Sequence, residues 1–132
     1  MPAPIVYVDH SNIRDGKLED VKAAIYELVT FVETREPRLL SYGFYLSEDE
    51  TGIAAVAIHP DSDSLETHMA IGGPEFRQFA ELINLHTIEI FGRPSAKALE
   101  QLHQKAAMLG ENGQVVVHDH AAGFVRLASA LA

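Results

Sequence analysis

Residues 35–83 decide the fold, and they read REPRLLSYGFYLSEDETGIAAVAIHPDSDSLETHMAIGGPEFRQFAELI. Two β-forming runs, Leu39–Ser47 and Ile53–His59, flank an acidic turn over 48–52 that ends in Gly52. Alternating apolar residues around a short turn with a final glycine are typical of an antiparallel hairpin. In the first run Leu40, Tyr42, Phe44 and Leu46 share one face, because side chains in a strand alternate.

A helix is expected to follow this hairpin from Asp61-Ser62-Asp63. Asp63 and Glu66 have the spacing of a capping box, which marks a helix start. Gly72-Gly73-Pro74 is predicted to divide the helix, with Pro74 in the first turn of its second piece. The segment therefore supplies two paired strands and one broken helix.

The flanking sequence supplies elements that complete and cover this sheet. Pro4–His10 is predicted as a strand, and 17–34 as an amphipathic helix with Asp15 as its N-cap. Further elements are expected at Asn84–Phe91 (strand), about 95–109 (helix), Gln114–His120 (strand) and Gly123–Ala132 (a helical turn or strand extension). The order β-α-β-β-α-β is that of an α+β, ferredoxin-like unit, with an added α-β. We expect one domain, with a core at about 4–92 and an extension at about 93–132.

Composition narrows the classes of function. The chain has 132 residues, enough for one domain, and a net charge of −9, which disfavours nucleic acid as a partner. It has no cysteine, so disulfides and thiolate chemistry are absent. No apolar run approaches the roughly 20 residues that span a bilayer, and the start lacks the pattern of a signal peptide. We expect a cytoplasmic protein without a membrane partner.

The predicted sheet has more apolar surface than its helices can cover. The strands at 4–10, 53–59 and 114–120 are apolar on both faces. Because a soluble monomer rarely exposes a large apolar face, we expect a homodimer that packs sheet against sheet.

Several short segments resemble the antibiotic biosynthesis monooxygenase family. They are Glu36-Pro37, Leu40-Ser41-Tyr42, Leu46-Ser47-Glu48-Asp49, Ser64-Leu65-Glu66-Thr67-His68 and Gly73-Pro74-Glu75-Phe76. The resemblance implies a dimeric α/β barrel of ferredoxin-like subunits. It also implies a small, aromatic organic substrate that oxygen attacks without metal or flavin, so that no cofactor is expected.

The sequence departs from the family pattern at four positions. Arg38 stands where the family often has glycine, and His59 where it often has tryptophan. In the haem-degrading branch, the resemblance places a tryptophan near His68 and an asparagine near Asp9. These replacements argue against haem degradation and leave the quinone-forming chemistry compatible.

His68 is the predicted catalytic residue, because a histidine at the pocket edge can take a proton from a phenol. The alternative is a structural histidine bonded to backbone at a helix break. Predicted substrate-binding residues are His10, Asn12, Tyr42, Phe79 and His86. His10 and Asn12 end a strand, where they rim a pocket or a solvated turn. Tyr42 and His86 are either pocket groups or satisfied core residues, and His86 is expected to share a face with Ile88 and Ile90.

His118 and His120 form an H-x-H pair whose rings lie on one side of a strand, a spacing that metals use. A site would need a third ligand, and His10, His103 or Asp9 are candidates. The pair alone is weak evidence, so no metal is predicted.

Two functions remain open from the sequence. One is a monooxygenase-like enzyme, and the other is a non-catalytic dimer of the same fold that binds or senses a small molecule. Fold alone does not choose between them.

Overall fold

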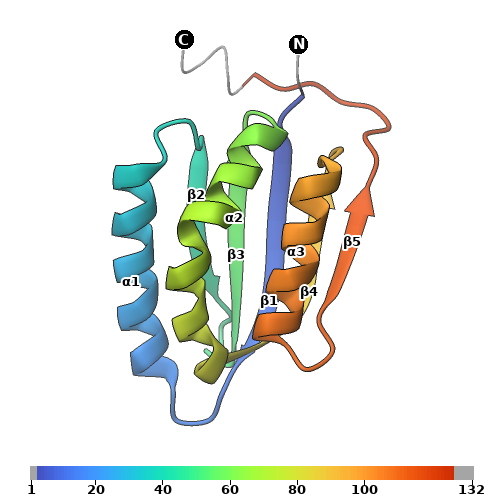
Figure 1. Cartoon of the computed structure of the whole chain (residues 1–132). Coiled ribbons are helices and arrows are strands. Elements are labelled where there is room, and N and C mark those ends of the chain that lie inside the picture. Colours follow the sequence, from blue (N-terminus) through green and yellow to red (C-terminus); the bar gives the residue numbers. More distant parts are fainter. Residues whose placement is uncertain (1–2, 127–132) are drawn as a thin grey trace.

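The computed structural model describes residues 3–126. Its elements, shown in Figure 1, are β1 (Ile5–Ile13), α1 (Leu18–Arg35), β2 (Ser41–Leu46), β3 (Gly52–His59), α2 (Ser62–Phe76), the short 3₁₀ helix η1 (Arg77–Glu81), β4 (Ile83–Phe91), α3 (Ala96–Leu109) and β5 (Gln114–His118).

The five strands form one sheet in the order β2-β3-β1-β4-β5. β1 pairs antiparallel with both β3 and β4, and β2 pairs antiparallel with β3. β5 adds to the far edge, parallel to β4, after the crossover through α3. The first four strands have the ferredoxin-like order, so the predicted α+β fold with an added α-β is confirmed.

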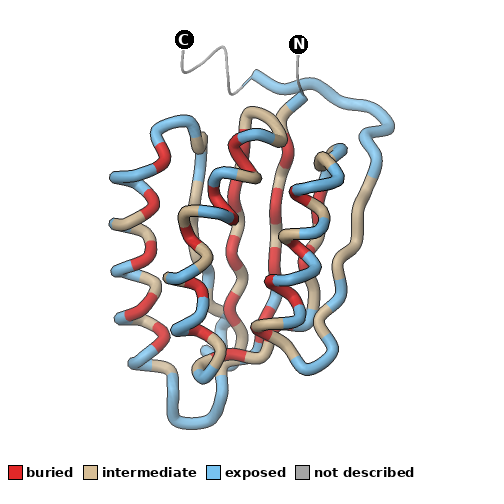
Figure 2. Tube along the Cα trace, in the orientation of Figure 1, coloured by how far each residue is buried: buried red, intermediate tan, exposed pale blue. Residues whose placement is uncertain are grey.

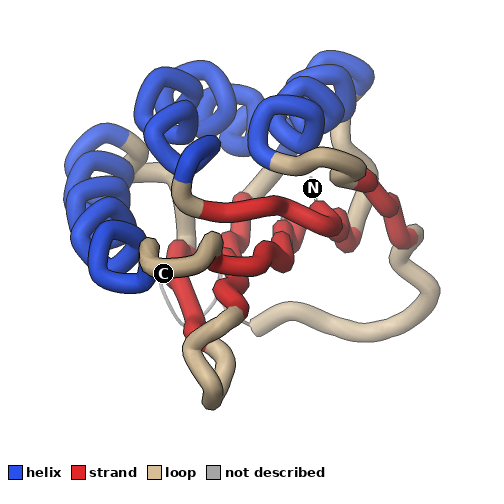
Figure 3. The backbone as a smooth tube through the Cα atoms, turned by 90° about the horizontal axis from the view of Figure 1, so that it is seen from below, coloured by secondary structure: helices blue, strands red, loops and turns tan. Residues whose placement is uncertain are grey.

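All three long helices cover the same face of the sheet, which gives two layers (Figure 3). Figure 2 shows buried backbone positions along the strands and on the sheet side of each helix. The strands follow a period of two, so that Ile53, Ala55 and Ala57 of β3 face the helices and are buried. On α1, Val21, Leu28 and Val32 recur at helical spacing and face the sheet.

The second helix corrects two predictions. Asp61 is its N-cap and accepts a hydrogen bond from the Ser64 backbone N–H, so Asp63 is not the capping residue. The helix also runs unbroken through Gly72-Gly73-Pro74 to Phe76, and the 3₁₀ helix η1 follows at once. Gly72 is needed for packing, because an added Cβ there would lie 2.5 Å from the Phe76 ring. Pro74 has no backbone N–H, so one hydrogen bond is missing in the last turn of the helix.

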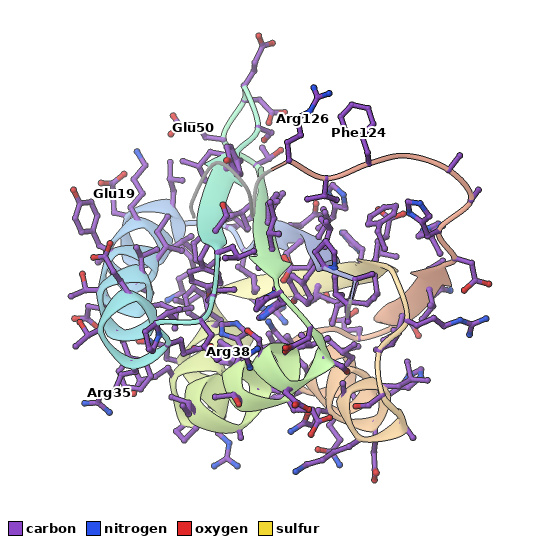
Figure 4. All side chains as sticks on the ribbon, turned by 90° about the horizontal axis from the view of Figure 1, so that it is seen from above. Glu19, Arg35, Arg38, Glu50, Phe124 and Arg126 are labelled. Atoms are coloured by element: carbon purple, nitrogen blue, oxygen red, sulfur yellow. The ribbon has the colours of Figure 1, made fainter. Side chains whose placement is uncertain are left out.

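Two element ends also differ from the prediction. The N-cap of α1 is Lys17, without a capping side chain, because Asp15 lies in the preceding turn. β5 ends at His118, and residues 119–126 form neither helix nor strand. This segment runs on the side of the sheet away from the helices, where Phe124 and Arg126 point outward (Figure 4). The expected tail element at Gly123–Ala132 lies partly outside the described residues.

No helix covers the other face of the sheet within residues 3–126 (Figure 3). Its central part carries alternate residues of β1 and β3 that are only partly buried, namely Val6, Val8, Ala54, Val56 and Ile58. Tyr45 and Phe91 are 62% and 40% exposed. In the part of the chain that the structure describes, no helix has the length and apolar character needed to cross a membrane.

Candidate functional site

A small hollow lies between the sheet and the helices. It offers about 30 Å³ to the centre of a water-sized sphere, roughly room for one or two water molecules. Most of the residues on its wall are apolar or aromatic. Besides Tyr42, four residues with polar or charged side chains line it, namely Tyr7, Asp9, Ser11 and Lys105. It is lined by Tyr7, Asp9, Ser11, Leu28, Tyr42, Phe44, Ile53, Ala55, Phe76, Phe79, Ile83, Lys105 and Leu109. Tyr42 and Phe79, both predicted from the sequence, therefore lie on its wall.

Three of the lining side chains form a continuous hydrogen-bonded chain. Lys105 Nζ donates to the Tyr7 hydroxyl at 2.8 Å, and the Tyr7 hydroxyl donates to Asp9 Oδ2. The other carboxylate oxygen, Asp9 Oδ1, accepts from the Ala55 backbone N–H at 3.2 Å. Tyr7 and Asp9 alternate on the inward face of β1, and Lys105 reaches them from α3, so the fold brings together residues 98 apart in sequence.

Burial sets the charge behaviour of this chain. It lowers the pKa of Lys105, because an ammonium loses its hydration there, and the nearby Asp9 opposes that shift. Burial first, and Asp9 second, hold the pKa of Tyr7 well above its usual range. Tyr42 has a raised pKa for the same first reason, with Asp9 and Glu36 adding to it. The two phenols therefore stay protonated. The Lys105 ammonium loses its proton more readily than that of an exposed lysine.

A second, larger cavity is a groove between α2 and α3 on the helix side. By the same measure it offers about 400 Å³. Its walls are Met69, Ala70, Gly73, Pro74, Phe76, Arg77, Gln101, Gln104, Lys105 and Met108. Phe76 and Lys105 belong to both cavities, so these two side chains form the partition between the hollow and the groove.

His68 lies beside the hollow but not on its wall. Its side chain is 2% exposed, and its Nδ1 is 2.8 Å from Glu36 Oε2. Three rings surround it with centroids 5.1–5.5 Å from its own, those of Tyr42, Phe76 and His59. The imidazole therefore contacts the hollow only through the Tyr42 and Phe76 rings.

His59, at the end of β3, extends this packed group. Its Nδ1 is 2.8 Å from the Ser64 hydroxyl, while its Nε2 is buried and has no partner among residues 3–126. Burial lowers the pKa of His59 to about 3, with the charges of His68 and Lys105 adding to the shift. Burial also lowers the pKa of His68, against the opposing effect of Glu36. Both histidines are therefore neutral at pH 7.

The structure does not bring His10, Asn12 or His86 to the hollow. His10 and Asn12 alternate with Asp9 and Ser11 on β1, so they point to the uncovered face, where His10 Nε2 lies 3.8 Å from Glu89 Oε2. The expectation that His86 shares a face with Ile88 and Ile90 is wrong. The register between β1 and β4 shifts at this point, leaving His86 without an opposite residue and exposed.

The two histidines of the H-x-H pair are placed differently. His118 ends β5, stacks on Phe91 at 4.6 Å and contacts Glu89, whereas His120 lies beyond the strand. His103 is exposed on α3. Within residues 3–126, no three His, Cys, Asp or Glu side chains converge as metal ligands do.

The sequence analysis did not identify Tyr7 and Lys105 as candidate functional residues. It considered Asp9 only as a third metal ligand and as the residue near the family's asparagine position. One signal was available for the lysine. Leu102, Lys105 and Leu109 follow helical spacing on one side of α3, so a lysine occupies a position of the buried stripe. Asp9 likewise falls on the inward side of β1, two residues after Tyr7.

Comparison with known proteins identifies the fold. No protein-family model matches the sequence, and no curated protein matches it. Among solved structures, MupZ from Pseudomonas fluorescens is 19% identical, with a TM-score of 0.73 over 97% of this chain and 93% of MupZ. SnoaB from Streptomyces nogalater, a cofactor-independent oxygenase, is 14% identical, with a TM-score of 0.60 over 71% of this chain and 96% of SnoaB.

A third similar structure, a candidate antibiotic biosynthesis monooxygenase from Bacteroides thetaiotaomicron, is 14% identical. Its TM-score is 0.59, over 71% of this chain and 90% of that one. The chain has the fold of antibiotic biosynthesis monooxygenases. At these identities the likeness concerns the fold alone. The match to MupZ covers nearly the whole chain, whereas the matches to the oxygenase and to the candidate monooxygenase cover about seven tenths of it.

Proposed function

We propose that this protein is a cofactor-independent monooxygenase-type enzyme that oxidises a small phenolic aromatic compound in the hollow between sheet and helices, which the substrate enlarges by displacing the Phe76 ring. One observation carries the proposal. A largely apolar, aromatic hollow contains a buried carboxylate, a phenol and an ammonium linked in one hydrogen-bonded chain. Such a cavity, apolar with a few convergent polar groups, is the usual form of a small-molecule site. The likeness in fold to a cofactor-independent oxygenase supports the reaction type.

The proposed reaction needs no external reductant. A phenol with a free ring C–H takes up one O₂ and gives a quinone and one water, so the substrate supplies all four electrons that O₂ accepts. Ionising the phenol makes the ring a better electron donor. The protein therefore has to remove a proton from the substrate and hold the resulting anion away from water.

Asp9 is the proposed base, because its carboxylate lines the hollow. Lys105, on the same wall, would stabilise the phenolate, and Tyr7 would keep the two groups in place. The catalytic role predicted for His68 stays a prediction. In this arrangement its ring acts through Tyr42, which it contacts edge-on and which lines the hollow.

The test is oxygen uptake with 1,5-dihydroxynaphthalene, whose expected product, 5-hydroxy-1,4-naphthoquinone, absorbs visible light. One O₂ should be consumed for each quinone formed, at a rate proportional to enzyme concentration and far above that of heat-denatured protein. Binding of the compound without uptake, seen as a rise in melting temperature, would instead support the non-catalytic binding function. Repeating the assay after dialysis against a chelator separates the protein's activity from that of trace metal.

The same proposal includes a cytoplasmic homodimer that packs through the uncovered sheet face. Val56 and Ile58 at its centre are only partly buried, and Tyr45, Phe91 and Phe124 on the same side are 62%, 40% and 77% exposed. Sedimentation should give a dimer at micromolar concentration, and Val56→Asp should give a monomer. Tyr26→Asp is the matched control, because Tyr26 is 81% exposed on α1. A wild-type monomer would refute the dimer.

A further inference from the structure

The partition between the hollow and the α2–α3 groove consists of two side chains that touch each other. Lys105 Nζ lies 4.1 Å from the centre of the Phe76 ring, and the two residues are 8% and 3% exposed. The hollow alone is too small for an aromatic ring, since it has room for roughly two waters. If the Phe76 ring turned aside, the hollow and the groove would become one continuous cavity that ends at Lys105.

Lys105 has donor capacity that the protein leaves unused. An ammonium carries three N–H donors, and among residues 3–126 only the Tyr7 hydroxyl accepts a hydrogen bond from it. Asp9 Oδ2 is 3.9 Å away, close enough for attraction but beyond hydrogen-bonding distance. Leaving a buried charged donor unpaired is costly, so the remaining N–H groups favour an oxygen that a ligand would bring.

Two more orphaned polar atoms belong to the same pair of cavities. The Ser11 hydroxyl, on the wall of the hollow, is buried without a partner within residues 3–126, and so is Oε1 of Gln101, a residue that lines the groove. Buried polar atoms are normally paired, and exceptions often mark places where a ligand binds.

The charge of the groove indicates the sign of that ligand. The described residues lining the groove include two cations, Lys105 and Arg77, and no acid. This is notable in a chain with a net charge of −9. Asp9, the one acidic residue that lines the hollow, is already held by two donors, Tyr7 and the Ala55 N–H. An anion arriving along the groove therefore meets positive charge first.

We propose that the hollow and the α2–α3 groove form one binding site for an aromatic molecule with an ionised oxygen, a carboxylate or an enolate, and that Lys105 Nζ binds that oxygen at the partition. Phe76 moves to admit the ligand, and Arg77 attracts it at the outer end. The inference rests on the proposed function only in that the ring to be oxidised occupies the hollow. Anion recognition itself requires no turnover.

Two probes of equal ring size test this site, 2-naphthoate and its neutral counterpart 2-naphthalenemethanol, with affinities measured by calorimetry. Neither probe is a phenol, so the result is independent of any oxidation. The wild type should bind the carboxylate about tenfold tighter than the alcohol, as expected for one charge-assisted hydrogen bond. Lys105→Met should bring the two affinities within about threefold of each other, because the ammonium is lost. Lys97→Met, the control on the exposed side of α3, should keep the preference.

A second variant tests the partition separately and covers the case in which Lys105→Met does not fold. Phe76→Ala opens the wall, so it should tighten binding of both probes several-fold and keep the preference for the carboxylate. Wild-type protein that does not distinguish the two probes, or that binds neither at millimolar concentration, overturns the proposal. So does a Phe76→Ala variant whose affinities are unchanged. Binding with the expected preference but no oxygen uptake would leave this site standing and remove the proposed reaction.

Discussion

Two buried polar groups lie side by side in the core, and they differ in how their side chains meet a cavity. Tyr7, Asp9 and Lys105 face a hollow, and Lys105 retains free donors. Glu36 and His68 are also buried, and the hydrogen bond between them is already made. His68 is packed among aromatic rings, and it lines neither of the two cavities that Glu36 lines. Each group contains buried side chains with shifted pKa values, Tyr7 and Lys105 in the first and His68 in the second, so neither property separates a reactive site from a structural one.

What separates them is whether a whole hydrogen-bonded chain reaches one cavity. Tyr7, Asp9 and Lys105 all line the hollow, so a substrate there meets an acceptor and a donor together. The carboxylate of Glu36 is instead paired with His68, which fixes the positions of the two side chains. Glu36 ends α1, and His68 belongs to α2, so their hydrogen bond ties two helices together beneath β2. We therefore assign chemistry to the first group and support to the second, and four predictions test this division.

The largest expected effect is on turnover. Asp9→Asn removes the proposed base and should lower the rate of oxygen uptake by roughly 10²- to 10⁴-fold, the usual contribution of such a group. Glu36→Gln in the packed group keeps a hydrogen-bond acceptor for His68 and should lower the rate by less than about tenfold. Asp15→Asn, in the exposed turn before α1, is the surface control. Equal losses in Asp9→Asn and Glu36→Gln would erase the distinction.

The next effect is on the pH dependence of stability. Native His59 has a pKa of about 3, whereas in the unfolded chain it titrates near the usual value, about 6.5. The contribution of neutral His59 to the free energy of unfolding is therefore complete above pH 6.5. It is lost as pH falls towards 3, because in this range only the unfolded state takes up the proton. Wild type should lose up to about 1.4 kcal/mol per pH unit relative to His59→Gln over this range. Urea unfolding of both proteins at pH 7, 6, 5 and 4.5 measures the difference, and parallel curves would show that His59 is not buried in neutral form.

Substituting either of two neighbouring glycines should change the stability by a smaller amount. Both lie near Phe76, whose ring lines the hollow and also packs against His68. A Cβ at Gly72 would press on the Phe76 ring, whereas a Cβ at Gly73 meets no atom within 4 Å. Gly72→Ala should therefore cost about 1–3 kcal/mol of stability through overpacking. Gly73→Ala should add about 0.5–1 kcal/mol through helix propensity. Chemical denaturation compares the two, and equal effects would mean that the ring yields freely.

The sequence predicts those parts of the molecule that local periodicity controls. Tyr42 and Phe44 face the core as expected, because alternation along β2 follows directly from strand geometry. His86 shows where this reasoning ends. The shift in register that exposes it arises from pairing between β1 and β4, and no turn residue marks it in the sequence. If side-chain alternation is continued through such an irregularity, the residues beyond it are assigned to the wrong face of the sheet.

The candidate site was less predictable than the fold for a related reason. His68 stands out in the sequence, yet its packing depends on Glu36, 32 residues away, and on rings from three other positions. Lys105 looks like a surface lysine on a helix until Tyr7, 98 residues away, is placed beside it. Helical spacing puts Lys105 on the buried side of α3, but only the folded chain shows that its ammonium ends at a hollow.

Two serines provide the smallest and most direct comparison, because one substitution can be made in each group. Ser64→Ala removes the partner of His59 Nδ1, and His59 would then have no bonded ring nitrogen among the described residues. This should cost about 1–2 kcal/mol of stability. Ser11→Ala removes a buried hydroxyl that has no partner within residues 3–126, so it should be neutral or stabilise by up to about 1 kcal/mol. Urea midpoints with unchanged slopes report both values, and a Ser11→Ala variant as unstable as Ser64→Ala would mean that ordered water already satisfies the Ser11 hydroxyl in the hollow.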